Sequence, residues 1–175
     1  MDRQQLKEAM SKAEVETTDV VGAERRAFLN AAFLEHLGAE MAGNVPAIVA
    51  TFAKDGHLSF NGVRYDTPER LTAFHEDFGW DGHGMLSDIG GEIVRLLYTH
   101  DSVVVEYLVR AHVQVALGEA PAGRAVAFPM CVIYRFDGAG KLLSERGYAD
   151  SGALLPQPVL PPVTMRGRPA GAKEA

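Results

Sequence analysis

The sequence RAVAFPMCVIYRF-DGAG-KLLSERGYAD (residues 124–150) carries the strongest structural signal of the chain. Its first arm is rich in β-branched and aromatic residues, and a second, more polar arm follows the turn. The glycines of the DGAG segment (residues 137–140) supply the positive φ angles that a tight reversal needs. This pattern predicts a β-hairpin. Because an isolated hairpin is only marginally stable in water, the rest of the chain must provide a surface for it to pack against.

The composition is typical of one globular domain. The 175 residues are 47% hydrophobic and 23% charged, and a chain of this length can bury one substantial core. The formal net charge of -6 argues against nucleic acid as a partner, because proteins that bind it cluster Lys and Arg. No apolar run approaches the roughly 18 residues of a membrane span, and the N-terminus lacks an apolar signal segment. We therefore expect a cytoplasmic protein that binds neither nucleic acid nor membrane.

Helical patterns fill the first half of the chain. Apolar residues recur at helical spacing in four segments, residues 2–16, 23–42, 45–52 and 67–78. Thr67 before Pro68 is a typical start for the last of these helices. A short strand is expected at residues 57–61. We interpret residues 1–20 as an accessory N-terminal helix, because Thr17-Thr18-Asp19 breaks the pattern after it.

The second half of the chain changes to a period of two, which is typical of strands. Strands are predicted over residues 89–99, 102–117, 125–136 and 141–150. Apart from the accessory N-terminal helix, three helices are followed by long consecutive strands. This order predicts an α+β fold, in which a curved antiparallel sheet wraps around the helices and leaves a pocket between them. This domain spans residues 21–157. The Pro-rich residues 158–175 have few apolar anchors, so we expect them to be a disordered tail.

Several motifs between residues 25 and 157 resemble the SnoaL-like branch of the nuclear-transport-factor-2-like superfamily. MAGNVPAIVATF (residues 41–52) is similar to the family's break between its first two helices, and PAGR (121–124) to a loop before a strand. DSGALLPQ (150–157) resembles the closing segment of the polyketide cyclases. The resemblance implies a cone-shaped α+β barrel with an apolar pocket, usually dimeric through the outer face of the sheet. Members catalyse aldol-type ring closure, isomerisation, dehydration or epoxide opening, and some only bind.

Asp150 is the first candidate for catalysis. Its motif matches the carboxylate that acts as acid or base in the cyclases, and strand alternation puts it on one face with Ser144, Arg146 and Tyr148. If this face lines the pocket, apolar burial would raise the pKa of Asp150 and let it exchange a proton with a carbon acid. The alternative is a structural Asp150 that ends the strand or pairs with Arg146.

Other positions depart from the characterised branches. Tyr107 and Val109 stand where an epoxide hydrolase would have Arg and a second Asp. The base that an isomerase would carry near Phe60 is absent, and residues 128–136 contain no His where a cyclase would have one. A partner for Asp150 must therefore come from another part of the chain, or there is none.

Two of the six histidines are candidates for the pocket. His83 lies in a loop between two glycines beside Trp80, where dehydratases of this superfamily place a pocket His. It is the second catalytic candidate, and the alternative is a histidine in a surface loop without a catalytic role. His36, on the long helix near where an isomerase has a catalytic Tyr, is expected to point inward. The others are expected on surfaces, in turns or on the outer sheet face: His57, His75, His100 and His112. No His pair has metal-ligand spacing, so no metal is expected.

The remaining binding residues are aromatic and apolar. The predicted pocket wall contains Phe60, Trp80, Tyr107, Met130, Tyr134 and Tyr148. The aromatic rings suit a flat, apolar ligand, and the hydroxyl groups of the three tyrosines could donate hydrogen bonds to a carbonyl on it. We expect a cofactor-free enzyme that acts on a polyketide-like or polycyclic ketone, with aldol-type cyclisation first and isomerisation or dehydration second. A non-catalytic binding or dimerisation module of the same fold is the alternative.

Overall fold

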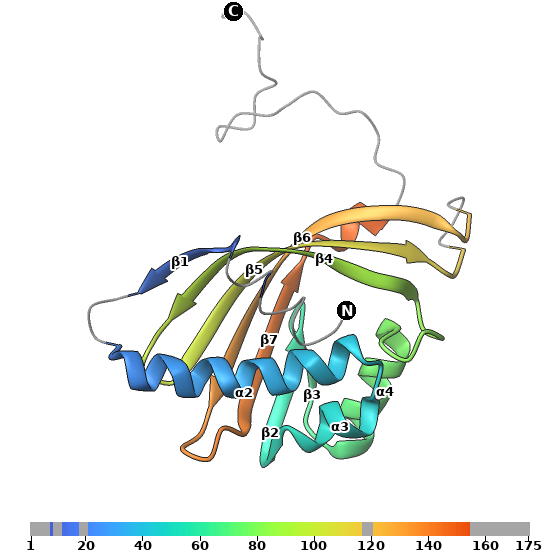
Figure 1. The fold of residues 1–175 in the computed structure, drawn as a ribbon. Helices are drawn as coiled ribbons and strands as arrows, with labels where there is room; N and C mark the ends of the chain where they lie inside the picture. Colours follow the sequence, from blue (N-terminus) through green and yellow to red (C-terminus); the bar gives the residue numbers. More distant parts are fainter. Residues whose placement is uncertain (1–7, 9–11, 18–20, 117–120, 155–175) are drawn as a thin grey trace, which may run out of the picture.

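A curved sheet forms the frame of the protein, and its helices lie on one side of that sheet (Figure 1). The computed structural model describes residues 8, 12–17, 21–116 and 121–154. The strands are β1 (Glu14–Thr17), β2 (Phe52–Phe60), β3 (Val63–Tyr65), β4 (Leu86–Tyr98), β5 (Ser102–Val113), β6 (Arg124–Phe136) and β7 (Leu142–Ala149). The helices are α2 (Ala23–Met41), α3 (Val45–Ala50), α4 (Pro68–Phe78) and the 3-10 helix η1 (Ser151–Leu154). This arrangement confirms the predicted α+β class.

The long strands pair in the order of the sequence. Within the described residues the sheet has seven strands in the order β1-β4-β5-β6-β7-β2-β3. Strands β4 to β7 are antiparallel neighbours, and β5 and β6 pair without interruption from Ser102↔Arg135 to Val113↔Arg124. On either side of these four strands, β1 runs parallel to β4 and β2 runs parallel to β7, and the edge strand β3 is antiparallel to β2. The sheet is therefore mixed, and only its centre is the antiparallel meander that the sequence predicted.

Helix α2 packs its apolar face against the inner side of the sheet. Its buried residues recur every three to four positions, as the amphipathic pattern requires, and are Leu29, Ala32, Phe33, His36, Leu37 and Glu40. Two of these six, His36 and Glu40, are polar. A buried His and Glu one turn apart on an otherwise apolar face need partners inside the protein, because burial of an unpaired charge is costly.

The predicted helix starts and stops are largely observed. Thr67 Oγ1 accepts a hydrogen bond from the backbone N–H of Arg70 at 3.3 Å, so it caps α4 as expected. Helix α3, predicted over residues 45–52, ends at Ala50, because strand β2 already begins at Phe52. Its end is held by the Thr51 hydroxyl, which donates to the carbonyl of Ile48 at 2.6 Å.

The N-terminal prediction was wrong in part. Glu8 and Lys12 are helical and form an ion pair of 2.8 Å, but Glu14–Thr17 forms strand β1 beside β4, so a helix cannot extend to residue 16. Pairing with the edge of β4 outweighs the weak local preference for helix. The proposed tail at residues 158–175 lies outside the described residues. None of the described helices is long and apolar enough to cross a membrane.

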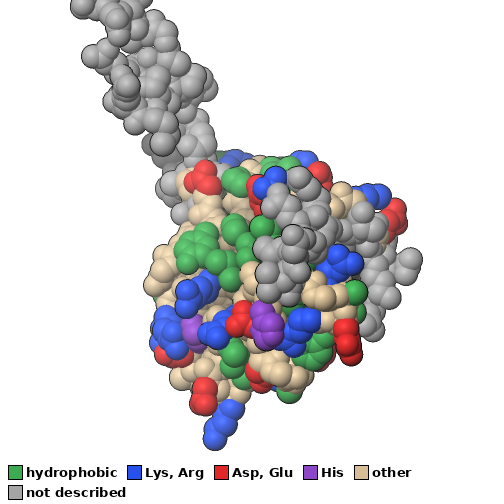
Figure 2. Space-filling view, turned by 90° about the vertical axis from the view of Figure 1, so that its left-hand side faces the viewer, with side chains coloured by type: hydrophobic (Ala, Val, Ile, Leu, Met, Phe, Trp, Pro, Cys, Tyr) green, Lys and Arg blue, Asp and Glu red, His purple; other side chains and the backbone are tan. Residues whose placement is uncertain are grey.

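Figure 2 shows the face of the molecule that lies on the left-hand side of Figure 1. On it, Lys and Arg side chains are interspersed with Asp and Glu, and hydrophobic side chains gather in its upper part. Because positive and negative side chains are mixed on this face, their charges pair at short range rather than create a large electrostatic potential of one sign.

Candidate active site

An apolar cavity of about 70 Å³ lies between the helices and the inner face of the sheet. Five of the side chains that the sequence assigned to a pocket line it: Phe60, Trp80, Tyr107, Met130 and Tyr134. Gly147 of β7 also lines it, and a Cβ atom at this position would come within 2.7 Å of the Phe60 ring, so glycine makes room for that ring. Two carboxylates, Glu40 and Glu145, belong to the same lining.

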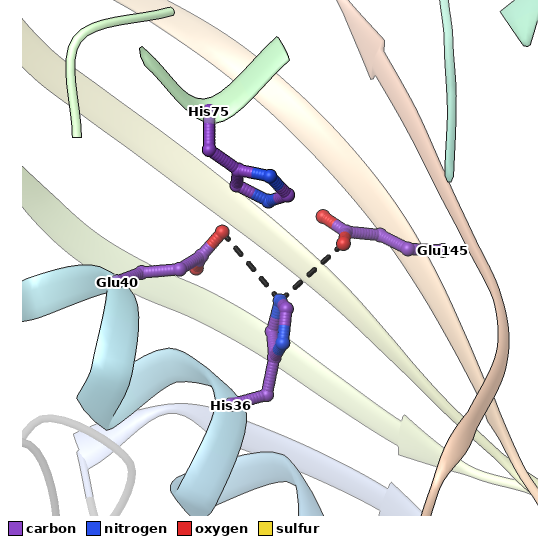
Figure 3. A group of neighbouring side chains, drawn as sticks. All are labelled: His36, Glu40, His75 and Glu145. Carbon is purple, nitrogen blue, oxygen red and sulfur yellow. Dashed lines mark ion pairs between the residues drawn. The ribbon is translucent and has the colours of Figure 1, made fainter. Parts of the chain in front are cut away.

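The two carboxylates are part of a buried cluster of four side chains, His36, Glu40, His75 and Glu145, which we call the His/Glu cluster (Figure 3). His36 and Glu40 stand one turn apart on α2, His75 comes from α4 and Glu145 from β7. Each residue is at most 6% exposed. One nitrogen or oxygen atom from each of the four side chains lies within 4.8 Å of the others.

His36 is the centre of the cluster. Its Nε2 lies 3.3 Å from Glu145 Oε2 and 3.6 Å from Glu40 Oε1, the two contacts drawn in Figure 3. Its Nδ1 lies 2.7 Å from Thr51 Oγ1; because the Thr51 hydroxyl donates to a carbonyl, Nδ1 is the donor in this bond. Burial alone would lower the pKa of His36, but the charges of the two carboxylates outweigh it and raise the pKa to about 10. His36 is therefore an imidazolium at neutral pH.

The other members of the cluster have shifted protonation equilibria as well. Burial raises the pKa of Glu40, and the positive charge of His36 opposes that shift only in part. Burial lowers the pKa of His75 and keeps its ring neutral. His75 Nδ1 donates to the carbonyl of Leu71 at 2.6 Å, because a carbonyl can only accept. The Nε2 of His75 is thus left without a proton and is directed toward the cluster (Figure 3).

A pair of tyrosine hydroxyls adds to the polar groups beside the cavity. The oxygens of Tyr107 and Tyr134 lie 3.2 Å apart, so one hydroxyl donates to the other. Burial raises the pKa of both phenols well above the usual value. They therefore stay protonated at neutral pH, and one O–H of the pair is available to donate to a ligand.

Asp150, the first catalytic candidate, does not reach this cavity. It is exposed, accepts a hydrogen bond from the N–H of Gly152 at 3.0 Å, and lies with Tyr148 beside a groove on the opposite face of the sheet. Tyr148 is 51% exposed. Because Glu145 and Gly147 face the cavity, alternation along β7 turns Asp150 and Tyr148 outward. Assignment of their strand face to the pocket was wrong.

The structure also separates His83 from the cavity and places His75 inside the protein. His83 is exposed beside a second groove, which shares the Phe60, Phe74 and Phe78 side chains with the cavity wall. His75 was expected at the surface but is fully buried, so that expectation was wrong. His36 does point inward, as predicted, but it is not part of the cavity lining; it contacts the two carboxylates that are.

Sequence reasoning did not identify Glu40, His75 or Glu145. One signal was present: His36 and Glu40 have i, i+4 spacing on the apolar face of a helix, where charged residues are rare unless they are paired. A search for closely spaced histidines could not find the cluster, because its members come from three separate elements.

A curved sheet covered on its inner side by helices, with a lined cavity between the layers, is the architecture of the nuclear-transport-factor-2-like class. The sequence model of the SnoaL-like domain matches residues 31–145, and the chain belongs to this family. No curated protein has a significant sequence match to it.

Several solved structures share the fold with only distant similarity in sequence. AclR from Streptomyces galilaeus, assigned as a hydroxylase, has a TM-score of 0.61 and 21% identity over 80% of this chain and 91% of its own. A protein from Jannaschia sp. CCS1, assigned to the SnoaL-like polyketide cyclases, has a TM-score of 0.61 and 16% identity over 73% and 89%. A ketosteroid isomerase-like protein from Catenulispora acidiphila, solved with trimethylamine, has a TM-score of 0.59 and 20% identity over 74% and 93%. Such similarity establishes the fold alone.

Proposed function

We propose that this protein is a proton-transfer enzyme whose cavity binds a small, apolar carbonyl compound. The observation that carries the proposal is the placement of two carboxylates, Glu40 and Glu145, in the lining of an otherwise apolar cavity that also contains a tyrosine hydroxyl pair. A carboxylate in apolar surroundings is a stronger base than one in water, and a protonated phenol stabilises a developing oxyanion.

Glu40 is assigned as the proton acceptor, because Glu145 lies closer to the imidazolium of His36. Glu40 takes the proton from the carbon next to the carbonyl, the C–H electron pair becomes the enolate double bond, and the charge moves to the carbonyl oxygen. The Tyr107 hydroxyl donates to this oxygen. If the ketone carries a C=C bond β,γ to the carbonyl, the intermediate is a dienolate, and return of the proton to its γ carbon moves the double bond and completes an isomerisation. Attack of the enolate on a second carbonyl, with the proton delivered to the new alkoxide, completes an aldol cyclisation.

The size of the cavity bears on the ligand. Its volume of about 70 Å³ lies below the roughly 300–1,000 Å³ of sites for drug-sized ligands. A single-ring or short-chain ketone is thus favoured over the polycyclic ligand that the family resemblance implies.

Solvent deuterium exchange tests the proposal without knowledge of the natural substrate. Small cyclic ketones such as cyclohexanone are incubated in D₂O with the ion-free protein, and exchange next to the carbonyl is followed by NMR. The wild type is expected to accelerate exchange, and Glu40→Gln to lose about 100-fold or more of that acceleration. Asp150→Asn keeps the acceleration if the cavity is the site.

A binding module without catalysis is the second candidate, favoured by the pairing of the cluster side chains with one another. Quenching of the fluorescence of Trp80 by ketones that show no accelerated exchange would support it. A homodimer through the outer sheet face is proposed with either function, since the exposed Tyr148 lies on that face. Sedimentation at micromolar concentration tests the dimer.

A further inference from the structure

The His/Glu cluster has the chemistry of a metal-binding site as well as that of a proton-transfer site. Two imidazoles and two carboxylates converge from α2, α4 and β7, and of these four groups the proposed reaction transfers a proton only to Glu40. His75, in particular, has no part in that reaction although it is fully buried. Two nitrogen and two oxygen ligands are a donor set that suits divalent transition ions, whereas Mg²⁺ and Ca²⁺ favour oxygen alone.

Both imidazole rings are held so that the same nitrogen faces inward. The Nδ1 atom of His36 donates to the Thr51 hydroxyl, and the Nδ1 atom of His75 donates to the Leu71 carbonyl. Histidines that bind metals almost always make this second hydrogen bond, because it fixes the ring orientation and directs the other nitrogen to the ion. Two independent rings, on two helices, meet this requirement here.

The distances are close to those of a coordination sphere. Metal–ligand bonds of roughly 2.0–2.2 Å in a tetrahedron put neighbouring ligand atoms about 3.3–3.6 Å apart. Nε2 of His36 lies 3.3 Å from Glu145 and 3.6 Å from Glu40. One ligand atom from each of the four residues lies within 4.8 Å of the others, about 1 Å more than the longest separation in such a tetrahedron.

Several of the converging atoms have no hydrogen bond of their own. The Nε2 atom of His75 is buried without a hydrogen-bond partner, and His36 Nε2 and Glu145 Oε2, which form an ion pair 3.3 Å apart, lack the geometry of a hydrogen bond. Buried polar atoms are normally satisfied, and a group that is not calls for an explanation such as an ion. An ion with two positive charges would offset both carboxylates and satisfy both nitrogens at once.

We propose that His36, Glu40, His75 and Glu145 bind one divalent transition-metal ion of the Zn²⁺ type at the inner end of the cavity. Glu40 and Glu145 line the cavity, so the ion would lie at the cavity wall. The proposal does not depend on the proposed reaction, which was written for the ion-free cluster. When bound, the ion replaces the His36 proton as the charge that balances the carboxylates and adds a Lewis acid beside the ligand.

Calorimetric titration of the EDTA-dialysed protein tests the site. ZnCl₂ is expected to bind at one ion per chain, MnCl₂ more weakly, and MgCl₂ much more weakly still. His75→Ala is expected to weaken Zn²⁺ binding by about 100-fold or more. His112→Ala is the matched control, because His112 also pairs with a carboxylate, that of Asp88 at 3.2 Å, but at the exposed surface. This control is expected to bind Zn²⁺ like the wild type.

Two further measurements make the result independent of one variant. Zn²⁺ should raise the melting temperature of the wild type and of His112→Ala but not that of His75→Gln, a variant that retains a polar side chain at the buried position. X-ray absorption at the zinc edge should show two imidazole nitrogens at roughly 2.0–2.1 Å. Absence of stoichiometric Zn²⁺ binding by the wild type, or binding that persists in both His75 variants, would overturn the metal site. Deuterium exchange by the ion-free protein is a separate readout, so either proposal can fail alone.

Discussion

Removal of His36 should expose how the charges of the His/Glu cluster balance. In the ion-free protein, His36→Leu replaces the imidazolium by a side chain of similar size and leaves Glu40 and Glu145 buried with no positive charge between them. Breaking a buried charge network by removal of one member costs roughly 3–5 kcal/mol. The change in the pKa of His36, from the usual 6.5 to about 10, corresponds to a similar free energy, on the order of 5 kcal/mol.

Urea unfolding at neutral pH with EDTA, followed by the fluorescence of Trp80, measures this loss. Trp80 is the single tryptophan of the chain and lines the cavity, so its signal reports on the region around the cluster. His112→Leu serves as the control, because the exposed pair that it breaks is worth less than about 1 kcal/mol.

A triple variant separates the charge effect from general damage to the core. In His36→Leu/Glu40→Met/Glu145→Met the whole charged network is replaced by apolar side chains of similar length. Its stability should return to within about 1 kcal/mol of the wild type or exceed it, because no buried charge remains to be desolvated. If His36→Leu alone loses no more than His112→Leu, or if the triple variant is the least stable of all, the electrostatic account of the cluster is wrong.

Three further predictions concern other parts of the fold, each measured by denaturation. Gly147→Ala should cost roughly 1–3 kcal/mol and impair ligand binding, because its Cβ would come 2.7 Å from the Phe60 ring; an unchanged midpoint would show that the ring moves freely. Thr67→Ala should cost about 1 kcal/mol through loss of the α4 cap, whereas Thr67→Ser should cost much less. The hydrogen bond from Arg135 lowers the pKa of Asp101, so this pair stabilises the fold above the ordinary pKa of 3.8 and the stabilisation is lost as pH falls below it. Arg135→Gln should flatten this acid dependence by less than about 1 kcal/mol, since both side chains are partly exposed, and an unaltered pH profile would contradict the assignment.

Local patterns were sufficient for most of the secondary structure. The period-two runs predicted strands β4 to β7 and the helical spacing predicted α2 and α4, because each pattern reflects which side chains are buried on one face of one element. The cap at Thr67 was predictable for the same reason, since its hydrogen bond is made within the same turn. Strand β1 was missed because its four residues are held by the edge of β4, a partner far away in the sequence.

The candidate site required the tertiary structure for two physical reasons. Alternation along β7 shows that Glu145 and Asp150 lie on opposite faces, but not which face is covered by helices; the sequence alone favoured Asp150, and the packing of α2 and α4 selects Glu145. The cluster also joins His36 to Glu145 across more than a hundred residues of chain, through the curvature of the sheet. The sequence pattern around a residue indicates whether it suits a helix or a strand, because that depends on its near neighbours in the chain. Whether four buried side chains come into contact depends on how their separate elements pack together.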